Sequence, residues 1–146
     1  MAYCTQTDLN RIYTDAELQQ LTDDQNKGNI DSDRITAAIT QADELINSYS
    51  RAQHTISAWS GSSIPPLIKS LSVSLTSYYL WKRRRKGQID EEKEATYKAC
   101  IQTLKDINAG KIKLSDSESF ANTGEIISTN KTSSNRVLTS TELAKY

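Results

Sequence analysis

The sequence predicts an all-α fold, a small bundle of about four helices with an extended C-terminal arm. Apolar residues recur at spacings of three and four along three long segments, which is the pattern of amphipathic helices. Only five Gly and two Pro occur in the chain, which argues against a loop-rich all-β fold. Composition changes at Gly110, and 12 of the 37 residues from there onward are Ser or Thr. We therefore expect a helical body over residues 1–109 and an arm used for assembly over residues 110–146.

Two short helices are predicted near the N-terminus. Thr7 can cap a first helix that carries Leu9 and Ile12 on its apolar face. The segment Thr14-Asp15-Ala16-Glu17 is a capping box, in which a hydroxyl and a carboxylate bond free amides reciprocally. A polar loop is expected to follow over residues 23–29.

Residues 32–51 form the best-defined predicted helix, with Asp31 or Ser32 as its cap. The neighbouring carboxylates Asp43 and Glu44 are assigned to a face that points to solvent. A loop containing His54 and Trp59 is expected over residues 53–63. The apolar face of the helix consists of Ile35, Ala38, Ile39, Ala42, Leu45, Ile46 and Tyr49.

The next segment can be interpreted as a strand or as a helix. Leu71, Val73 and Leu75 alternate with serines, as in a strand, but apolar residues at helical spacing extend from Leu67 to Tyr79. We favour a helix because the longer pattern is harder to obtain by chance. Pro65-Pro66 would open it, and basic residues followed by Gly87 would end it.

A last helix is predicted to start at Asp90 and to end at Gly110. Its first turns are acidic, which is favourable at the positive end of the helix dipole. The expected inward face is formed by Tyr97, Cys100, Ile101, Leu104 and Ile107.

The charge of the chain is zero overall but unevenly distributed. Residues 65–89 contain six Lys or Arg and no acid. This excess can be a solvated helix end, a docking surface for an acidic partner, or a contact with DNA phosphates. A balanced total charge disfavours a general nucleic-acid binder. The candidate partner-binding residues in this cluster are Lys82, Arg83, Arg84, Arg85 and Lys86.

No enzymatic, cofactor or metal site is predicted. Cys4 and Cys100 are far apart in sequence and are expected to be free thiols, and His54 is the single histidine. A calcium loop that starts at Asp23 would place Lys27 and Arg34 at ligand positions, so a turn followed by a helix cap is the preferred interpretation. No segment is long and apolar enough to indicate a membrane span, and no signal peptide is recognisable.

The end of the arm contains apolar residues that could anchor it to another chain. Its polar composition cannot offset the entropy of ordering, which is about 1–2 kcal/mol per residue. We therefore expect the arm to gain order only against a partner. The candidate anchors are Arg136, Val137, Leu138, Leu143 and Tyr146.

These motifs, in this order and spacing, resemble the head–tail connector (adaptor) proteins of tailed bacteriophages, in particular their Mu-like branch. The resemblance covers about residues 3–114 and departs in the loop at residues 53–63, while the end of the arm is similar to the closing motif of that family. The matching residues are Tyr3, Thr7-Asp8-Leu9, Leu21-Thr22-Asp23, Gly28, Ile30, Asp31, Ala42-Asp43, Ile46, Tyr49, Pro65-Pro66-Leu67, Leu71, Tyr79, Tyr97, Leu104, Ile107, Gly110–Leu114, Arg136-Val137-Leu138 and Leu143–Tyr146.

The resemblance implies a structural role. A connector subunit of this kind would fold in the host bacterial cytoplasm and reside in the virion neck, in a ring of identical copies beneath the portal protein. Its partners would be the portal, neighbouring copies and a tail or stopper protein, with DNA only as cargo in the channel and no membrane. The alternative is a DNA-binding packaging or regulatory module that acts through Lys82–Lys86.

Overall fold

The computed structural model describes residues 2–84 and 90–114, which form five α-helices and no strand. The all-α prediction is therefore confirmed for this part of the chain. The helices are α1 (Gln6–Leu9), α2 (Asp15–Thr22), α3 (Ser32–Ser50), α4 (Pro66–Arg84) and α5 (Glu91–Asn108), with 3-10 turns at Ile56–Ala58 and Gly61–Ser63.

Most of the predicted helix starts are confirmed. Thr14 forms its capping box with Glu17, and the Asp31 side chain accepts hydrogen bonds from the amides of Asp33 and Arg34. The prediction for the first helix was wrong. Thr5, not Thr7, is its cap, and the helix ends at Leu9, so that Ile12 lies beyond it and is 62% exposed.

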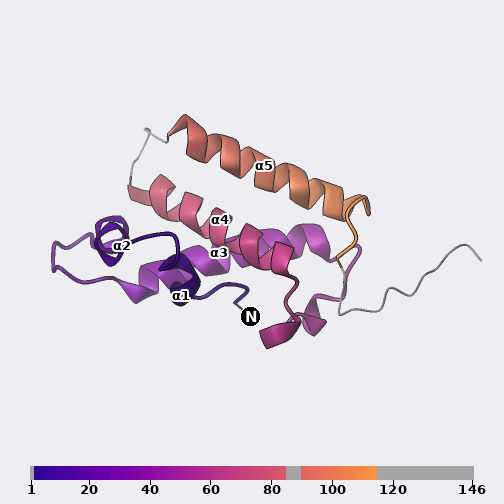
Figure 1. The fold of residues 1–146 in the computed structure, drawn as a ribbon, viewed down its shortest axis with the longest axis horizontal. Coiled ribbons are helices and arrows are strands. Elements are labelled where there is room, and N and C mark those ends of the chain that lie inside the picture. Colours follow the sequence, from indigo (N-terminus) through magenta and orange to yellow (C-terminus); the bar gives the residue numbers. More distant parts are fainter. Residues whose placement is uncertain (1, 85–89, 115–146) are drawn as a thin grey trace, which may run out of the picture.

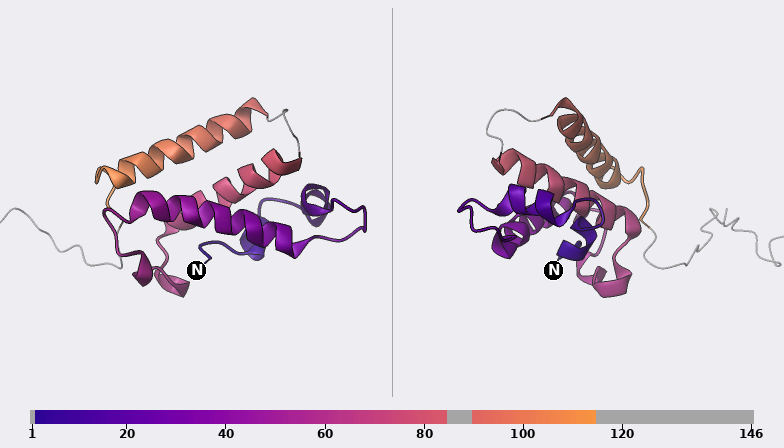
Figure 2. Two further views of the ribbon diagram at one scale, coloured as in Figure 1. Left: turned by 180° about the vertical axis from the view of Figure 1, so that it is seen from behind. Right: turned by 60° about the vertical axis from the view of Figure 1, so that its left-hand side comes forward.

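Helix α4 occupies the centre of the bundle. It packs against α3 and α5, and it also contacts the two short helices α1 and α2 (Figures 1 and 2). Nine of its residues are buried, including Ser72, Thr76 and Ser77. A helix that is buried on several sides needs small side chains where neighbours approach closely. Ser72 is buried between Leu71 and Val73, and this buried polar position contributes to the alternating pattern that resembles a strand.

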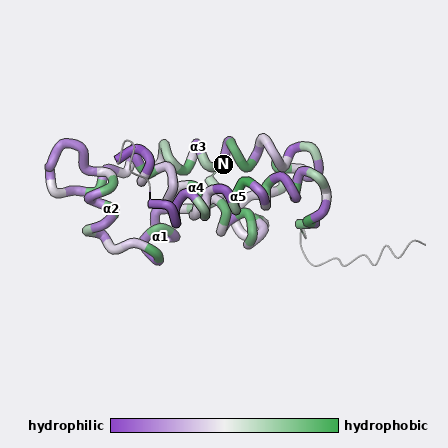
Figure 3. Tube along the Cα trace, turned by 90° about the horizontal axis from the view of Figure 1, so that it is seen from above, coloured by the Kyte–Doolittle hydropathy of each residue, from purple (hydrophilic) through white to green (hydrophobic). Residues whose placement is uncertain are grey.

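The core consists of two clusters. Seen from above, apolar and polar residues alternate along the long helices, as amphipathic packing requires (Figure 3). The first cluster joins α3, α4 and α5, and the second joins α1, α2, α3 and α4. Cys100 belongs to the first cluster as predicted, and both cysteines are buried and free.

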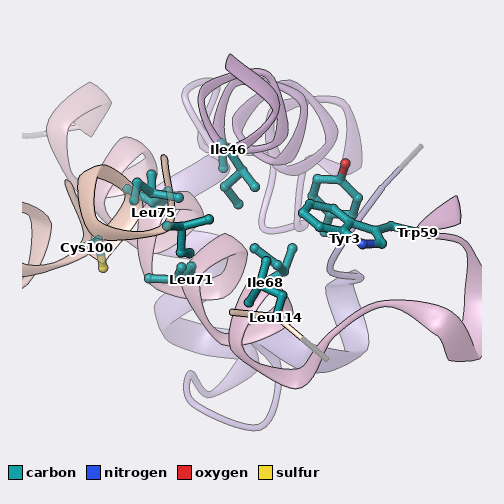
Figure 4. Close-up of a cluster of buried hydrophobic side chains, with 11 residues drawn as sticks. Tyr3, Ile46, Trp59, Ile68, Leu71, Leu75, Cys100 and Leu114 are labelled. Carbon is teal, nitrogen blue, oxygen red and sulfur yellow. The ribbon is translucent and has the colours of Figure 1, made fainter. Parts of the chain in front are cut away.

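Residues outside the helices complete the first cluster. Trp59 is fully buried and its ring meets the edge of Tyr3 at a centroid distance of 5.9 Å, although the sequence placed it in a loop (Figure 4). Leu114 is also buried and lies beside Ile68 (Figure 4). The packed body therefore includes Leu114, beyond residue 109 where the sequence placed its end.

The prediction that Asp43 points to solvent was wrong, because Asp43 is 4% exposed. Its carboxylate accepts a hydrogen bond from the Tyr3 amide at 3.0 Å and another from the Ser72 hydroxyl at 2.8 Å. Burial raises the pKa of this carboxyl, and the two hydrogen bonds oppose that shift. One side chain thus joins the N-terminal segment, α3 and α4.

Removal of the Trp59 side chain tests the contribution of the loop to the core. We expect Trp59→Ala to lower the free energy of unfolding by about 3–5 kcal/mol, because it leaves a large cavity. His54→Ala, which removes a half-buried ring tilted on Trp59, should cost clearly less. Urea denaturation measures both values, and equal losses would contradict a structural role for Trp59.

Substitution of Asp43 tests the buried carboxylate. Asp43→Ala should lower the free energy of unfolding by about 1–3 kcal/mol, because the Tyr3 amide and the Ser72 hydroxyl lose their partner. Asp43→Asn should recover most of this loss, since an amide can accept from Tyr3 and donate to Ser72. Glu44→Ala is the matched control, as that neighbouring carboxylate is exposed.

The contribution of the Asp43 carboxyl to stability depends on pH. Because its pKa is raised in the folded protein, the native state retains the proton to higher pH than the unfolded chain. Its contribution to stability should therefore fall as pH rises from the unfolded value of 3.8 through the folded one. Asp43→Asn should remove this contribution from the pH dependence of the free energy of unfolding, measured by urea denaturation from pH 3.8 upward, while Glu44→Ala should preserve it.

Candidate protein-interaction site

The basic cluster at the end of α4 is partly engaged within the chain. Arg83 donates hydrogen bonds to the Asp24 carboxylate and to the Leu21 carbonyl. Arg84 lies 3.3 Å from the same carboxylate. Lys82 lies over the Tyr78 ring, 5.9 Å from its centroid. Arg83 therefore attaches the connection between α2 and α3 to α4, a role that none of the three sequence interpretations included.

Asp24 is the centre of a small network of charges. Arg34 is 3.7 Å from its carboxylate, in addition to the contacts of Arg83 and Arg84. The hydrogen bond from Arg83 contributes most to the lowered pKa of Asp24. Two of the arginines proposed for docking thus already have an acidic partner in their own chain, which reduces the charge available to an external ligand.

The other candidate partner-binding residues fall outside the part of the chain that the structure describes. These residues are Arg85, Lys86, Arg136, Val137, Leu138, Leu143 and Tyr146.

The loop that begins at Asp23 forms a turn that is closed by its own carboxylate. The Asp23 carboxylate accepts hydrogen bonds from the amides of Gln25, Lys27 and Gly28 at 2.8–3.1 Å. These amides, with Lys27 the largest contributor, lower the pKa of Asp23. These hydrogen bonds form the turn that the sequence analysis preferred, and Asp31 caps the helix that follows it.

The candidate metal ligands do not converge among the described residues. No group of three or more His, Cys, Asp or Glu side chains is arranged to hold a metal ion there. Cys4 lines a hollow of about 490 Å³ between the N-terminal residues and α3. Burial raises the pKa of its thiol, which disfavours the reactive thiolate. Within the same residues, no helix has the length and apolar character of a membrane span.

A groove on the surface of α4 is the best candidate for a protein contact. Two hollows of about 350 and 140 Å³ adjoin, and both are lined by Ile12 and Ser74. We call the pair the Ile12 groove. Its floor is α4, one wall is the segment after α1, and the other wall is the first part of α5. The lining consists of Asp8, Arg11, Ile12, Tyr13, Pro66, Lys69, Ser70, Val73, Ser74, Ser77, Tyr78, Lys93 and Thr96.

The serines on the floor of this groove are already bonded inside the protein. The Ser70 hydroxyl donates to the Leu67 carbonyl at 2.8 Å. Ser77 shares a hydrogen bond with the Tyr13 hydroxyl, and Ser74 interacts with the Cys100 thiol, where it opposes the rise in pKa that burial causes. The Ser70 and Ser77 hydroxyls therefore already have partners within the protein, so an apolar side chain can cover them without leaving them unbonded.

Charges at one end of the groove are unequally paired. Asp8 is 7% exposed and bonds Lys69 at 2.9 Å, while Arg11 approaches the same carboxylate only to 3.8 Å. Burial acts to raise the pKa of Asp8, but hydrogen bonds from Lys69 and Thr5 outweigh it and hold the pKa low. The Arg11 side chain is 75% exposed, so its guanidinium is available for another anion.

The sequence did not reveal this groove, because it placed Ile12 on a helix face. Ile12 is the large hydrophobic residue that stands out as exposed among the described residues. The available signal was the short spacing between Leu9 and the capping box at Thr14, which leaves little room for a helix to continue to Ile12.

The role of Arg83 in attaching the α2–α3 connection to α4 can be tested independently of assembly. We expect Arg83→Ala to accelerate amide hydrogen exchange in residues 23–31, because the Leu21 carbonyl and Asp24 lose their contacts to α4. Lys82→Ala is the control, since Lys82 has its aromatic contact within α4. Unchanged exchange in the Arg83 variant would contradict the attachment.

Comparison with known proteins identifies the family. The family model described as bacteriophage Mu, Gp36 matches residues 3–128, which include all but the first residue of the described body and the beginning of the arm. The match does not extend to residues 136–146, where a closing motif was expected. A comparison with curated proteins finds no match. Because the family model covers most of its length, the chain belongs to the bacteriophage Mu Gp36 family.

Proposed function

We propose that this protein is a structural subunit of the head–tail connector of a Mu-like phage. Identical copies form a ring beneath the portal protein and join it to a tail or stopper protein. The observation that carries the proposal is the family match over residues 3–128, which joins a small helical body and part of an arm in one unit. The virion neck is the proposed location.

The architecture of the chain supports a role in assembly. The body is held by two core clusters and by a buried carboxylate, so it can act as a rigid block. The Ile12 groove gives this block a hollow lined by Ile12, Val73 and Pro66, in which apolar surface of a partner could be buried. Side-by-side contacts between different surfaces of identical subunits can close into a ring.

The alternative of a DNA-binding module is less favoured. Two of its five basic residues, Arg83 and Arg84, contact Asp24 within the chain. A protein that binds DNA through phosphate contacts would show binding that falls steeply with salt. Strong salt-dependent binding of duplex DNA by the isolated chain would favour this alternative.

The proposal is tested with the purified chain and the portal protein of the same phage. Electron microscopy of the mixture should show an added ring of density on the portal. A chain that ends after Leu114 keeps the described core and should fold with the same thermal midpoint, but should not enter the ring. Failure of the full chain to bind the portal would contradict the connector role.

Normal incorporation of the shortened chain would instead contradict the use of the arm. Replacement of Arg85 and Lys86 by Ala then tests docking by the basic cluster, because it leaves the contacts of Arg83 and Arg84 with Asp24 in place. Loss of portal binding would support docking by the basic cluster, and unchanged binding would contradict it.

A further inference from the structure

We propose that the Ile12 groove binds Glu125-Ile126-Ile127 from the arm of a second copy of this chain. The inference rests on the proposed ring and deepens it, because it names the two surfaces that join neighbouring copies. Each copy then offers its groove to one neighbour and its arm to the other. This is a heterologous contact, which is the kind that closes rings.

The groove is suited to aliphatic side chains. Ile12 projects into solvent at the junction of the two hollows, and Val73 and Pro66 line the larger one. Ser70 on the floor has its hydroxyl bonded inside the protein. An incoming isoleucine would therefore cover apolar surface without leaving a floor hydroxyl unpaired, and each buried aliphatic side chain would favour the contact.

The charge of the groove favours a ligand that has an acidic residue next to its aliphatic residues. Lys69 is held by Asp8 at 2.9 Å, whereas Arg11 is largely exposed and only 3.8 Å from that carboxylate at its closest. Arg11 can therefore form a two-pronged hydrogen bond with an external carboxylate. At the other end, Lys93 interacts with Tyr13, Trp81 and Glu17, so Arg11 is the cation that best suits a ligand.

The arm of this chain has the complementary composition. Residues 115–128 contain three acids, Asp116, Glu118 and Glu125, and no Lys or Arg. Glu125 is followed directly by Ile126 and Ile127, so one acid adjoins two large aliphatic side chains. The family match continues through this segment and ends at residue 128, so the segment belongs to the same unit as the body.

Disulfide crosslinking distinguishes a neighbour's arm from the chain's own. A full-length chain with both Ile12→Cys and Ile127→Cys is assembled on the portal of the same phage and oxidised. The native Cys4 and Cys100 are buried and can stay. A contact between copies predicts a ladder of linked multimers on a non-reducing denaturing gel. Each single variant is the control and should give no ladder beyond the dimer.

The possible outcomes separate this inference from the proposed function. A ring that assembles but yields no disulfide, or yields only internally linked monomers, would overturn the inference and leave the connector role intact. The absence of any ring on the portal with the wild-type chain would contradict both the groove contact and the connector role. A ladder that reaches high multimers would support the neighbour contact.

Charge reversal provides a second, independent test. Arg11→Glu and Glu125→Arg should each weaken ring formation at least tenfold in the concentration required, and the double variant should recover most of the loss. Lys105→Glu reverses an exposed charge on α5 outside the groove and serves as the matched control. Thermal unfolding should show that the variants remain folded. No recovery in the double variant would contradict the pairing of Arg11 with Glu125.

Discussion

The body of this protein depends on one buried carboxylate. Asp43 accepts hydrogen bonds from the Tyr3 amide and the Ser72 hydroxyl, and it thereby fixes the N-terminal segment and α4 against α3. An unpaired carboxylate at this depth would be costly, so the surrounding residues must keep their places. Tyr3 then packs on Trp59, which closes the first core cluster, and Cys4 enters the second.

The same arrangement creates the surface that is available to other proteins. Helix α4 turns Ser72 toward Asp43 of α3 and presents Ser70, Ser74 and Ser77 in the groove between the segment after α1 and α5. The segment after α1 leaves Ile12 exposed beside this groove, and Arg83 holds the α2–α3 connection to the end of the same helix. One central helix therefore supports the core, the groove and the loop.

The sequence predicted the long helices and most of their caps, because periodicity and capping are local properties. It did not predict the burial of Asp43 or Trp59, since each depends on partners that are distant in the chain. Asp43 meets Ser72 and Tyr3, and a helical wheel of residues 32–51 contains no information about either. The candidate site was missed for a related reason, because the exposure of Ile12 follows from the early end of α1. Of the predicted basic cluster, only the positions of Lys82, Arg83 and Arg84 fall in the described part of the chain.

The burial of Leu114 has a geometric consequence for an assembled particle. Since Leu114 is fixed beside Ile68, it is the point from which the length of the arm is measured. A fully extended chain from Leu114 to Glu125 spans at most about 36–40 Å. In the ring proposed above, Leu114 of one copy and the Ile12 groove of the next could be no further apart than this tether allows, which limits how adjacent copies can be placed.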